Sequence, residues 1–179
     1  MGYAQRLITH YTFEDWKLWD GKWELHDGYP IAMSPAPLPE HQRVANNIKA
    51  EFTFALKKCK HCVVYDPIDY VIADDIIFIP DALIVCKPIV KKYLDFTPAL
   101  VVEVLSVSSS LRDRVTKYAL YEQQGVKYYL IVDTEKQTIE IFENQNGTYT
   151  SVSNAGNNYT FSLGDEEECA ATINFGEIW

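Results

Sequence analysis

The sequence lacks any segment that would carry it into a membrane. No apolar run approaches the roughly 20 residues that a membrane-spanning helix needs. The amino terminus also lacks the charged and then apolar regions of a signal peptide. These two absences predict a cytoplasmic protein with no membrane partner.

Cysteine is scarce, and its spacing predicts no disulfide scaffold. Four cysteines in 179 residues are too few to replace a hydrophobic core, so we expect reduced thiols. Cys59 and Cys62 form a C-x-x-C pair, but Cys86 and Cys169 are isolated and supply no second pair with the spacing of a zinc site. The pair also follows the carboxyl end of a predicted helix, whereas a redox pair needs a helix amino terminus to lower its thiol pKa. We therefore interpret Cys59 and Cys62 as two small reduced side chains.

An excess of positive charge is also lacking, since the net charge is −9. This balance argues against nonspecific attraction to a polyanion. The charge is uneven, however, because residues 41–62 have a balance of +4 and residues 134–179 a balance of −7. One part of the chain can therefore meet phosphates while another repels them.

Nothing in the sequence divides the chain. There is no internal repeat, low-complexity tract or linker, and 47% of the residues are hydrophobic. A chain of this length buries about 70% of its unfolded surface as one unit. We expect a single domain over residues 1–179.

The strongest pattern lies at Leu100–Leu105, an apolar and β-branched-rich run of strand length that is interrupted by Glu103. An ionised carboxylate in a strand covered on both faces costs several kcal/mol unless a cation or strong donors meet it. The sequence therefore predicts a compensating group beside Glu103.

A helix and a second strand follow this run. Ser106–Ser110 offer N-caps, apolar residues from Leu111 to Tyr118 recur at helical spacing, and Gly125 ends the helix. Tyr128–Val132 then completes a strand-helix-strand unit, which normally has parallel strands.

The remaining segments predict the rest of an α/β fold. We expect two helices, a short one capped at Thr12 and one of roughly 20 residues from Pro39. Hairpins turn at Asp27-Gly28 and at Asn146-Gly147, and further strands are expected at Val63–Tyr65, Ile68–Ala73 and Ile76–Cys86. Ser34–Pro39 is expected to be a proline-rich loop, Asp165–Glu168 a solvated loop, and Phe175–Trp179 a buried end of the chain. Together they predict a mixed central sheet flanked by helices, with an antiparallel hairpin at its edge.

Two carboxylates occupy buried strand positions. Pro80 interrupts the run Ile76–Cys86 and marks a bulge or bend that would re-aim Asp81. Asp81 and Glu103 can together hold Mg²⁺, which prefers one or two carboxylates with water and a substrate phosphate. Such a cation would offset the cost of burying both charges.

A polar stripe on the following helix can complete a hydrolytic site. Asp113, Lys117 and Tyr121 lie four residues apart and so share one helix face. If this face covers the strand ends, Lys117 can orient or help deprotonate a water molecule that attacks a phosphodiester. His41 and Gln42, at the start of the helix from Pro39, are further candidates for contact with phosphate.

The chain resembles a known family. Pro80-Asp81 followed by Glu103 in Val-Val-Glu-Val-Leu-Ser is similar to the PD-(D/E)XK nuclease superfamily, and the wider pattern closely resembles its Uma-two type restriction endonuclease family. The matching segments are Trp23-Glu24-Leu25 with Asp27-Gly28, Met33-Ser34-Pro35, Glu40-His41-Gln42, Pro80-Asp81, Glu103-Val104-Leu105-Ser106, Asp113 with Lys117 and Tyr121, and Gly125-Val126 before Tyr128–Asp133.

The resemblance implies a restriction-endonuclease-like fold and a metal-dependent endonuclease that acts on DNA. It makes Asp81 and Glu103 the ligands of Mg²⁺ or Mn²⁺ and Glu24 an accessory acidic residue. The superfamily lysine usually lies two residues after the glutamate, where this chain has Leu105. The Uma-two branch places this lysine on the next helix, at Lys117. By analogy with restriction-type enzymes, a homodimer is also expected.

The carboxylates and the lysine also have structural explanations. Glu103 can pair with a buried arginine such as Arg112 or Arg114. Asp81 can be a turn residue beside its proline. Lys117 with Asp113 can be an exposed helix pair that contributes about 0.3 kcal/mol.

The other polar candidates are equally open. Glu24 and His26, which alternate along a predicted strand, can lie on an exposed hairpin face. His41 can be a hydrogen-bonded core histidine, and Gln42 can face solvent. Two further functions remain open beside DNA cleavage: a nuclease-fold module that binds without turnover, and a metallohydrolase of a smaller phosphoester.

Overall fold

The computed structural model describes residues 9–33, 38–106, 111–152, 157–164 and 169–179. Three predicted segments therefore lie wholly or partly outside the described residues: the loop at Ser34–Pro39, the N-caps among Ser106–Ser110 and the loop at Asp165–Glu168.

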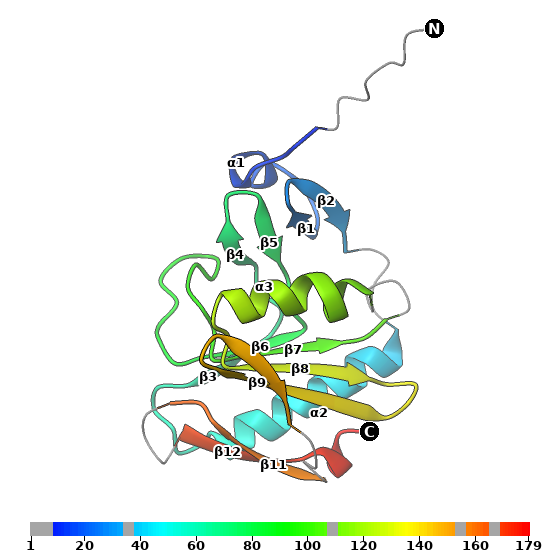
Figure 1. Ribbon diagram of the computed structural model, residues 1–179, viewed down its shortest axis with the longest axis vertical. Coiled ribbons are helices and arrows are strands. Elements are labelled where there is room, and N and C mark those ends of the chain that lie inside the picture. The colour runs from blue at the N-terminus through cyan, green and yellow to red at the C-terminus, as the bar shows by residue number, and fades with distance from the viewer. Residues whose placement is uncertain (1–8, 34–37, 107–110, 153–156, 165–168) are drawn as a thin grey trace, which may run out of the picture.

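A mixed six-stranded sheet forms the centre of the fold (Figure 1). Its strands are β3 (Val63–Tyr65), β6 (Ala82–Val85), β7 (Leu100–Val104), β8 (Tyr128–Asp133), β9 (Thr138–Gln145) and β10 (Thr148–Ser151). They lie in the order β10-β9-β8-β7-β6-β3. β7 and β8 pair in parallel, and the other neighbouring strands pair antiparallel. The predicted mixed sheet with its hairpin edge is confirmed.

Helices cover both faces of this sheet. Alternate residues of a strand point to opposite faces, and Val102 packs in one core with α2 (Pro39–Ala55) whereas Val101 packs in another with α3 (Tyr118–Gln123). All five residues of β7 are consequently buried. Glu103 shares the parity of Val101, so its side chain belongs to the face that α3 covers.

The helix between β7 and β8 turns its polar stripe inward and leaves two of its apolar residues exposed. It begins with a π-helical segment, η1 (Arg112–Lys117), and continues as α3. Leu111 and Val115 are 77% and 59% exposed, whereas Lys117 is 3% exposed. The polar stripe is therefore the buried face, because it meets the carboxylates described below.

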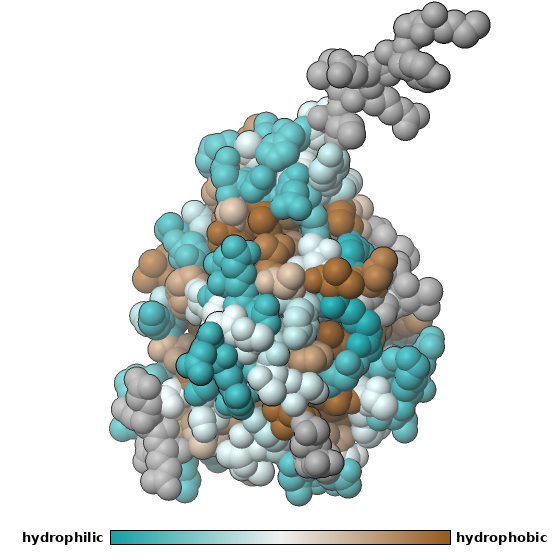
Figure 2. Space-filling model, in the orientation of Figure 1, coloured by the Kyte–Doolittle hydropathy of each residue, from teal (hydrophilic) through white to brown (hydrophobic). Residues whose placement is uncertain are grey.

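A second, four-stranded sheet lies at the end of the molecule that carries α1 (Phe13–Trp16) (Figure 1). Its strands are β1 (Trp23–His26), β2 (Tyr29–Ala32), β4 (Tyr70–Ala73) and β5 (Ile76–Phe78), in the order β2-β1-β5-β4. The predicted turn at Asp27-Gly28 is confirmed, with φ angles of 49° and 76° that match a type I′ turn. Hydrophilic side chains cover this end, and apolar patches interrupt the surface between it and α3 (Figure 2).

The predicted strand Ile76–Cys86 is in fact two strands in two sheets. β5 ends at Phe78 in the four-stranded sheet, and β6 begins at Ala82 in the six-stranded sheet. Pro80 lacks the N–H that a continuous ladder would need, so the chain changes sheets there. Asp81 therefore lies at the junction of the two sheets and not within a strand.

Two further strands were not predicted. β11 (Asn158–Ser162) and β12 (Ala170–Asn174) form an antiparallel pair, and β12 packs on α2. The final segment is buried as expected, through Phe175 and Ile178.

The prediction of reduced cysteines is wrong for this structure. Cys59 pairs with Cys169, and Cys62 pairs with Cys86. No local pattern indicates this pairing, because the partners are 110 and 24 residues apart. Folding brings them together where α2, β6 and β12 meet.

Candidate active site

Lys117 joins the two sheets. Its Nζ atom lies 2.8 Å from Glu24 Oε1 on β1 and 2.8 Å from Glu103 Oε1 on β7. It also lies 3.7 Å from Asp113 Oδ1 on its own helix. Lysine is almost never fully buried unless it is paired, and here the pairing explains the burial. The predicted compensating group beside Glu103 is this ammonium, so the arginine alternative does not hold; Arg114 pairs with Glu140 instead.

Glu24 is held from three directions. Its Oε2 lies 3.0 Å from His26 Nε2, and its Oε1 accepts a 2.9 Å hydrogen bond from the Ile79 N–H. Burial alone raises the pKa of Glu24, but the Lys117 charge and these hydrogen bonds lower it to about 2. The shared face of Glu24 and His26 is confirmed, and it is buried rather than exposed.

Glu103 is buried among charges of its own sign. Tyr121 donates a 3.0 Å hydrogen bond to Oε1, the same oxygen that contacts Lys117. Burial raises the pKa of Glu103 well above its usual value, although Lys117 opposes this shift. The carboxylates of Asp113, Asp81 and Glu24 add to the increase.

Asp81 lies close to Glu103. It directly precedes Ala82, which pairs with Val102 on β7, and its charge adds to the raised pKa of Glu103. The Val104 N–H donates a 2.8 Å hydrogen bond to Asp81 Oδ2. The Asp81 side chain is half-buried, so it marks the solvent-facing side of the cluster.

His41 faces Asp81 from the first turn of α2. Its Nε2 atom lies 3.3 Å from Asp81 Oδ2. Burial lowers the pKa of His41, but the hydrogen bond and the charge of Asp81 raise it above its usual value. Neighbouring Gln42 is exposed. The structure thus brings His41 into the cluster and leaves Gln42 at the surface.

Asp113 and Tyr121 both lie in the interior. Both are buried, as a continuous stripe with Lys117 requires. The Tyr129 hydroxyl on β8 donates a 2.9 Å hydrogen bond to the Asp113 carbonyl and so fixes η1 over the sheet. Tyr129 was not a candidate, because an aromatic residue in a buried strand carries no signal beyond packing.

Phe78 is a further residue that the sequence did not single out. The Lys117 ammonium lies 5.5 Å from the centre of its ring, and the centre of the His26 ring lies 4.5 Å from that of Phe78 in a tilted contact. The alternation of Glu24 and His26 was the available signal for His26. No pattern in the sequence signals the cation contact of Phe78.

The chemistry of this cluster fits a divalent cation. Three carboxylates, those of Glu24, Glu103 and Asp113, lie around the Lys117 ammonium, and Asp81 lies near Glu103. Burial is the main cause of the raised pKa of Glu103, and the neighbouring carboxylates add to it because one ammonium cannot neutralise them all. Carboxylate oxygens are the ligands that hard divalent ions prefer.

A mixed sheet that carries acidic residues and a lysine from the adjoining helix defines the restriction-endonuclease-like class of folds. The chain belongs to the family described as "Uma2: Putative restriction endonuclease", whose profile matches residues 11–172. The fold is also similar to a crystal structure of a "putative nuclease" from Anabaena variabilis, with a TM-score of 0.73 and 12% sequence identity over 93% of this chain and 96% of that one.

These comparisons confirm the predicted family and fold. No curated protein matches the chain. In the part of the chain that the structure describes, no helix combines the length and apolarity needed to cross a membrane. The chain thus belongs to a family of putative restriction endonucleases, and proteins of the restriction-endonuclease-like family generally use divalent metals.

Proposed function

We propose that the protein is a metal-dependent endonuclease that hydrolyses phosphodiester bonds in DNA. The observation that carries this proposal is the convergence of the buried Glu24 and Glu103 carboxylates on the Lys117 ammonium, with Asp81 close enough to Glu103 to act on its pKa. Family membership supports the reaction class. We take residues 1–179 as one domain that acts in the cytoplasm, where DNA is accessible, and as a homodimer if it cuts both strands.

Asp81 and Glu103 would hold Mg²⁺ or Mn²⁺, which lowers the pKa of bound water and stabilises developing negative charge when it is present. Among the described residues, Lys117 and Tyr121 both donate their hydrogen bonds to Oε1 of the Glu103 carboxylate. A metal ion would therefore engage Oε2. Asp81 presents its carboxylate from the half-buried side, where a phosphate can approach.

Lys117 would act as a fixed positive charge. The sequence left two roles open, orientation of water and help in its deprotonation. Two carboxylates at 2.8 Å favour the first role, because they hold the ammonium charged. Glu24 would position Lys117, and His26 would in turn hold Glu24 through its second oxygen.

His41 would contact the scissile phosphate or hold Asp81. It lies at the amino-terminal end of α2, whose backbone N–H groups favour an anion. The basic residues Arg43, Lys49 and Lys57 lie on or just after the same helix, in the segment with positive charge. This arrangement supports the approach of a DNA backbone along α2.

Conservative carboxylate variants test the proposal. Asp81→Asn and Glu103→Gln keep the shape of each side chain but remove a metal-binding charge, so we expect Mg²⁺-dependent nicking of supercoiled DNA to fall by at least about 100-fold. Asp95→Asn, at an exposed Lys91 pair, serves as the matched control and should cleave normally. Equal nicking by all four proteins would assign the activity to a contaminant.

Calorimetric titration with Mg²⁺ separates the alternatives. A binding module without turnover should show neither carboxylate-dependent Mg²⁺ binding nor cleavage. A metallohydrolase of a smaller phosphoester should bind Mg²⁺, cleave a chromogenic phosphodiester and leave DNA intact. Either pattern would contradict the proposed endonuclease.

A further inference from the structure

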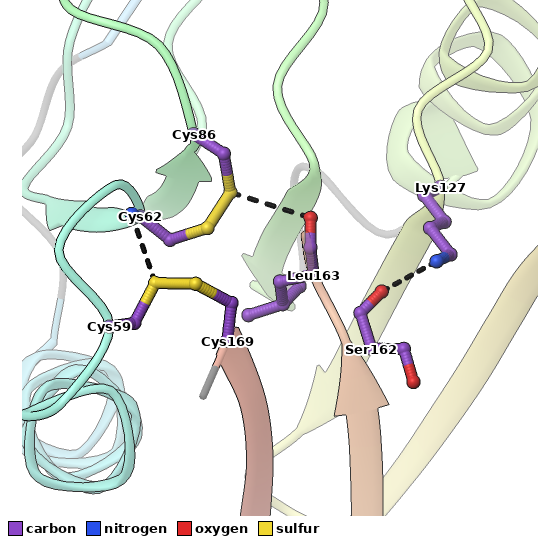
Figure 3. The surroundings of a disulfide bond; sticks show 7 residues. All are labelled: Cys59, Cys62, Cys86, Lys127, Ser162, Leu163 and Cys169. Atoms are coloured by element: carbon purple, nitrogen blue, oxygen red, sulfur yellow. Dashed lines mark hydrogen bonds between the residues drawn. A yellow bond between two sulfur atoms is a disulfide. The ribbon is translucent and has the colours of Figure 1, made fainter. Parts of the chain in front are cut away.

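The four cysteines converge from three separate segments into one cluster. Cys59 and Cys62 follow α2, Cys86 follows β6, and Cys169 precedes β12. Each disulfide joins one member of the C-x-x-C pair to one distant cysteine (Figure 3). The Sγ atoms of Cys59, Cys62 and Cys169 all lie within 4.8 Å of one another, and Cys86 Sγ is bonded to Cys62.

We propose that these four sulfurs form a Zn²⁺ site of four thiolates when the disulfides are reduced. The fold supplies the second pair of ligands that the sequence lacks, because it places Cys86 and Cys169 beside Cys59 and Cys62. This site is separate from the candidate active site and does not depend on the proposed nuclease function.

The spacing of the sulfurs suits tetrahedral zinc. A Zn–S distance of about 2.3 Å places tetrahedral sulfurs about 3.8 Å apart. The Sγ atoms of Cys59, Cys62 and Cys169, of which the first and the last are bonded, lie within 4.8 Å of one another. Reduction frees each bonded pair to separate towards the tetrahedral distance. The Cys62 N–H also donates a 3.2 Å hydrogen bond to Cys59 Sγ, the kind of contact that holds a thiolate ligand in place (Figure 3).

The surroundings favour a closed structural site. Cys62 and Cys169 are buried within the core beneath α2. Gly164 allows the strands to close over the cluster, because a Cβ at this position would lie 3.2 Å from Cys169 Cβ and 3.7 Å from Cys62 Sγ. A four-thiolate zinc complex carries a charge of about −2, and the lysines at positions 57, 58 and 60 surround Cys59 in the sequence.

The conversion of the disulfide form into the zinc form balances in electrons and protons. A dithiol reductant supplies two electrons and two protons to each disulfide and gives two thiols. Zinc then replaces the proton of each thiol, so four protons leave and no electron moves. In a reducing compartment this exchange substitutes one zinc ion for both cross-links, and α2, β6 and β12 stay joined.

Metal content tests the proposal directly. We expect protein expressed in a reducing cytoplasm and purified without chelator to hold one zinc per chain by elemental analysis. Replacement by Co²⁺ should give the absorption spectrum of a tetrahedral tetrathiolate. Metal-free protein with four titratable thiols, or with both disulfides intact under the same conditions, would overturn the proposal.

Variants assign the ligands. Cys86→Ser should weaken Co²⁺ binding at least about tenfold and change the thiolate spectrum, whereas the exposed neighbour His61→Ala should change neither. Asp81→Asn should keep its zinc, which separates this site from the acidic cluster. Loss of zinc in His61→Ala would refute the four-thiolate ligand set. If Cys86→Ser does not fold, the wild-type protein provides the test. Chemical modification of its thiols should release zinc at the same rate as the thiols react. Release of zinc before the thiols react would refute the assignment.

Discussion

The buried ammonium of Lys117 binds two carboxylates that come from different sheets. Its pKa is raised, because the charges of Glu103, Glu24 and Asp113 outweigh the effect of burial. A buried ion pair of this kind adds little net stability, but removal of one partner leaves an uncompensated charge in the interior. Lys117 therefore affects stability as well as chemistry, and the two effects can be measured separately.

Replacement of Lys117 by Met should destabilise the fold by about 3–5 kcal/mol near pH 8. Without the cation, the folded-state pKa of Glu24 rises above its unfolded value, and the pKa of Glu103, which is already raised, rises further. The variant should thus regain stability as the pH falls towards 5, because the unfolded chain no longer gains from ionising these groups. Urea unfolding at both pH values measures the effect.

The matched control is Lys91→Met. Lys91 pairs with Asp95 at the surface, and such a pair contributes less than about 1 kcal/mol. A loss of the same size at both pH values for Lys117→Met would contradict the assigned electrostatic cause.

At the scale of elements, the helix η1–α3 is held by its polar face. Val115 is exposed, so Val115→Ser should change the free energy of unfolding by less than about 0.5 kcal/mol. Val126, fully buried just after α3, is the contrasting position, and Val126→Ser should cost about 2–4 kcal/mol. Chemical denaturation of the two variants tests which face packs. A large loss for Val115→Ser would contradict the packing of the polar face against the sheet.

The elements that the sequence predicted are those with local signals. The parallel unit of β7 and β8, the helix from Pro39 and the Asp27-Gly28 turn follow from periodicity, capping and turn residues over a few positions. The inward face of the η1 helix could not be predicted in this way. Its orientation depends on carboxylates from strands far away in the sequence.

In the candidate active site, too, some features have local sequence signals and others depend on segments far apart in the sequence. Asp81, Glu103 and Lys117 carry motif signals, and Glu24 lies beside a strong hairpin turn. Their mutual distances depend on the change of sheets at Pro80, which joins the Glu24 sheet to the Glu103 sheet. The convergence of the four cysteines likewise depends on β11 and β12, whose short irregular sequences gave no strand signal.

Across the whole molecule, buried tyrosines make stability sensitive to alkaline pH. Burial raises the pKa of Tyr70 to about 12, and burial raises the pKa values of Tyr121 and Tyr129 well above the usual range. These groups stabilise the fold fully below pH 10, and this contribution is lost as the pH rises, because the unfolded chain ionises first. Tyr70 alone should account for about 2 kcal/mol by pH 12.

Urea unfolding between about pH 8 and pH 11, with tyrosinate absorbance as a second signal, measures this dependence. Tyr70→Phe should show a smaller loss of stability above pH 10 than the wild type. An unchanged slope would mean that Tyr70 ionises in the folded state as freely as in the unfolded one.

The register of β6 against β7 has a consequence for how the family could diverge. Since side chains alternate between faces, one extra residue between Asp81 and Ala82 would turn Asp81 away from Glu103 while leaving every strand and both cores in place. A relative that gains or loses a single codon at this junction could therefore separate Asp81 from Glu103 and still keep the same fold.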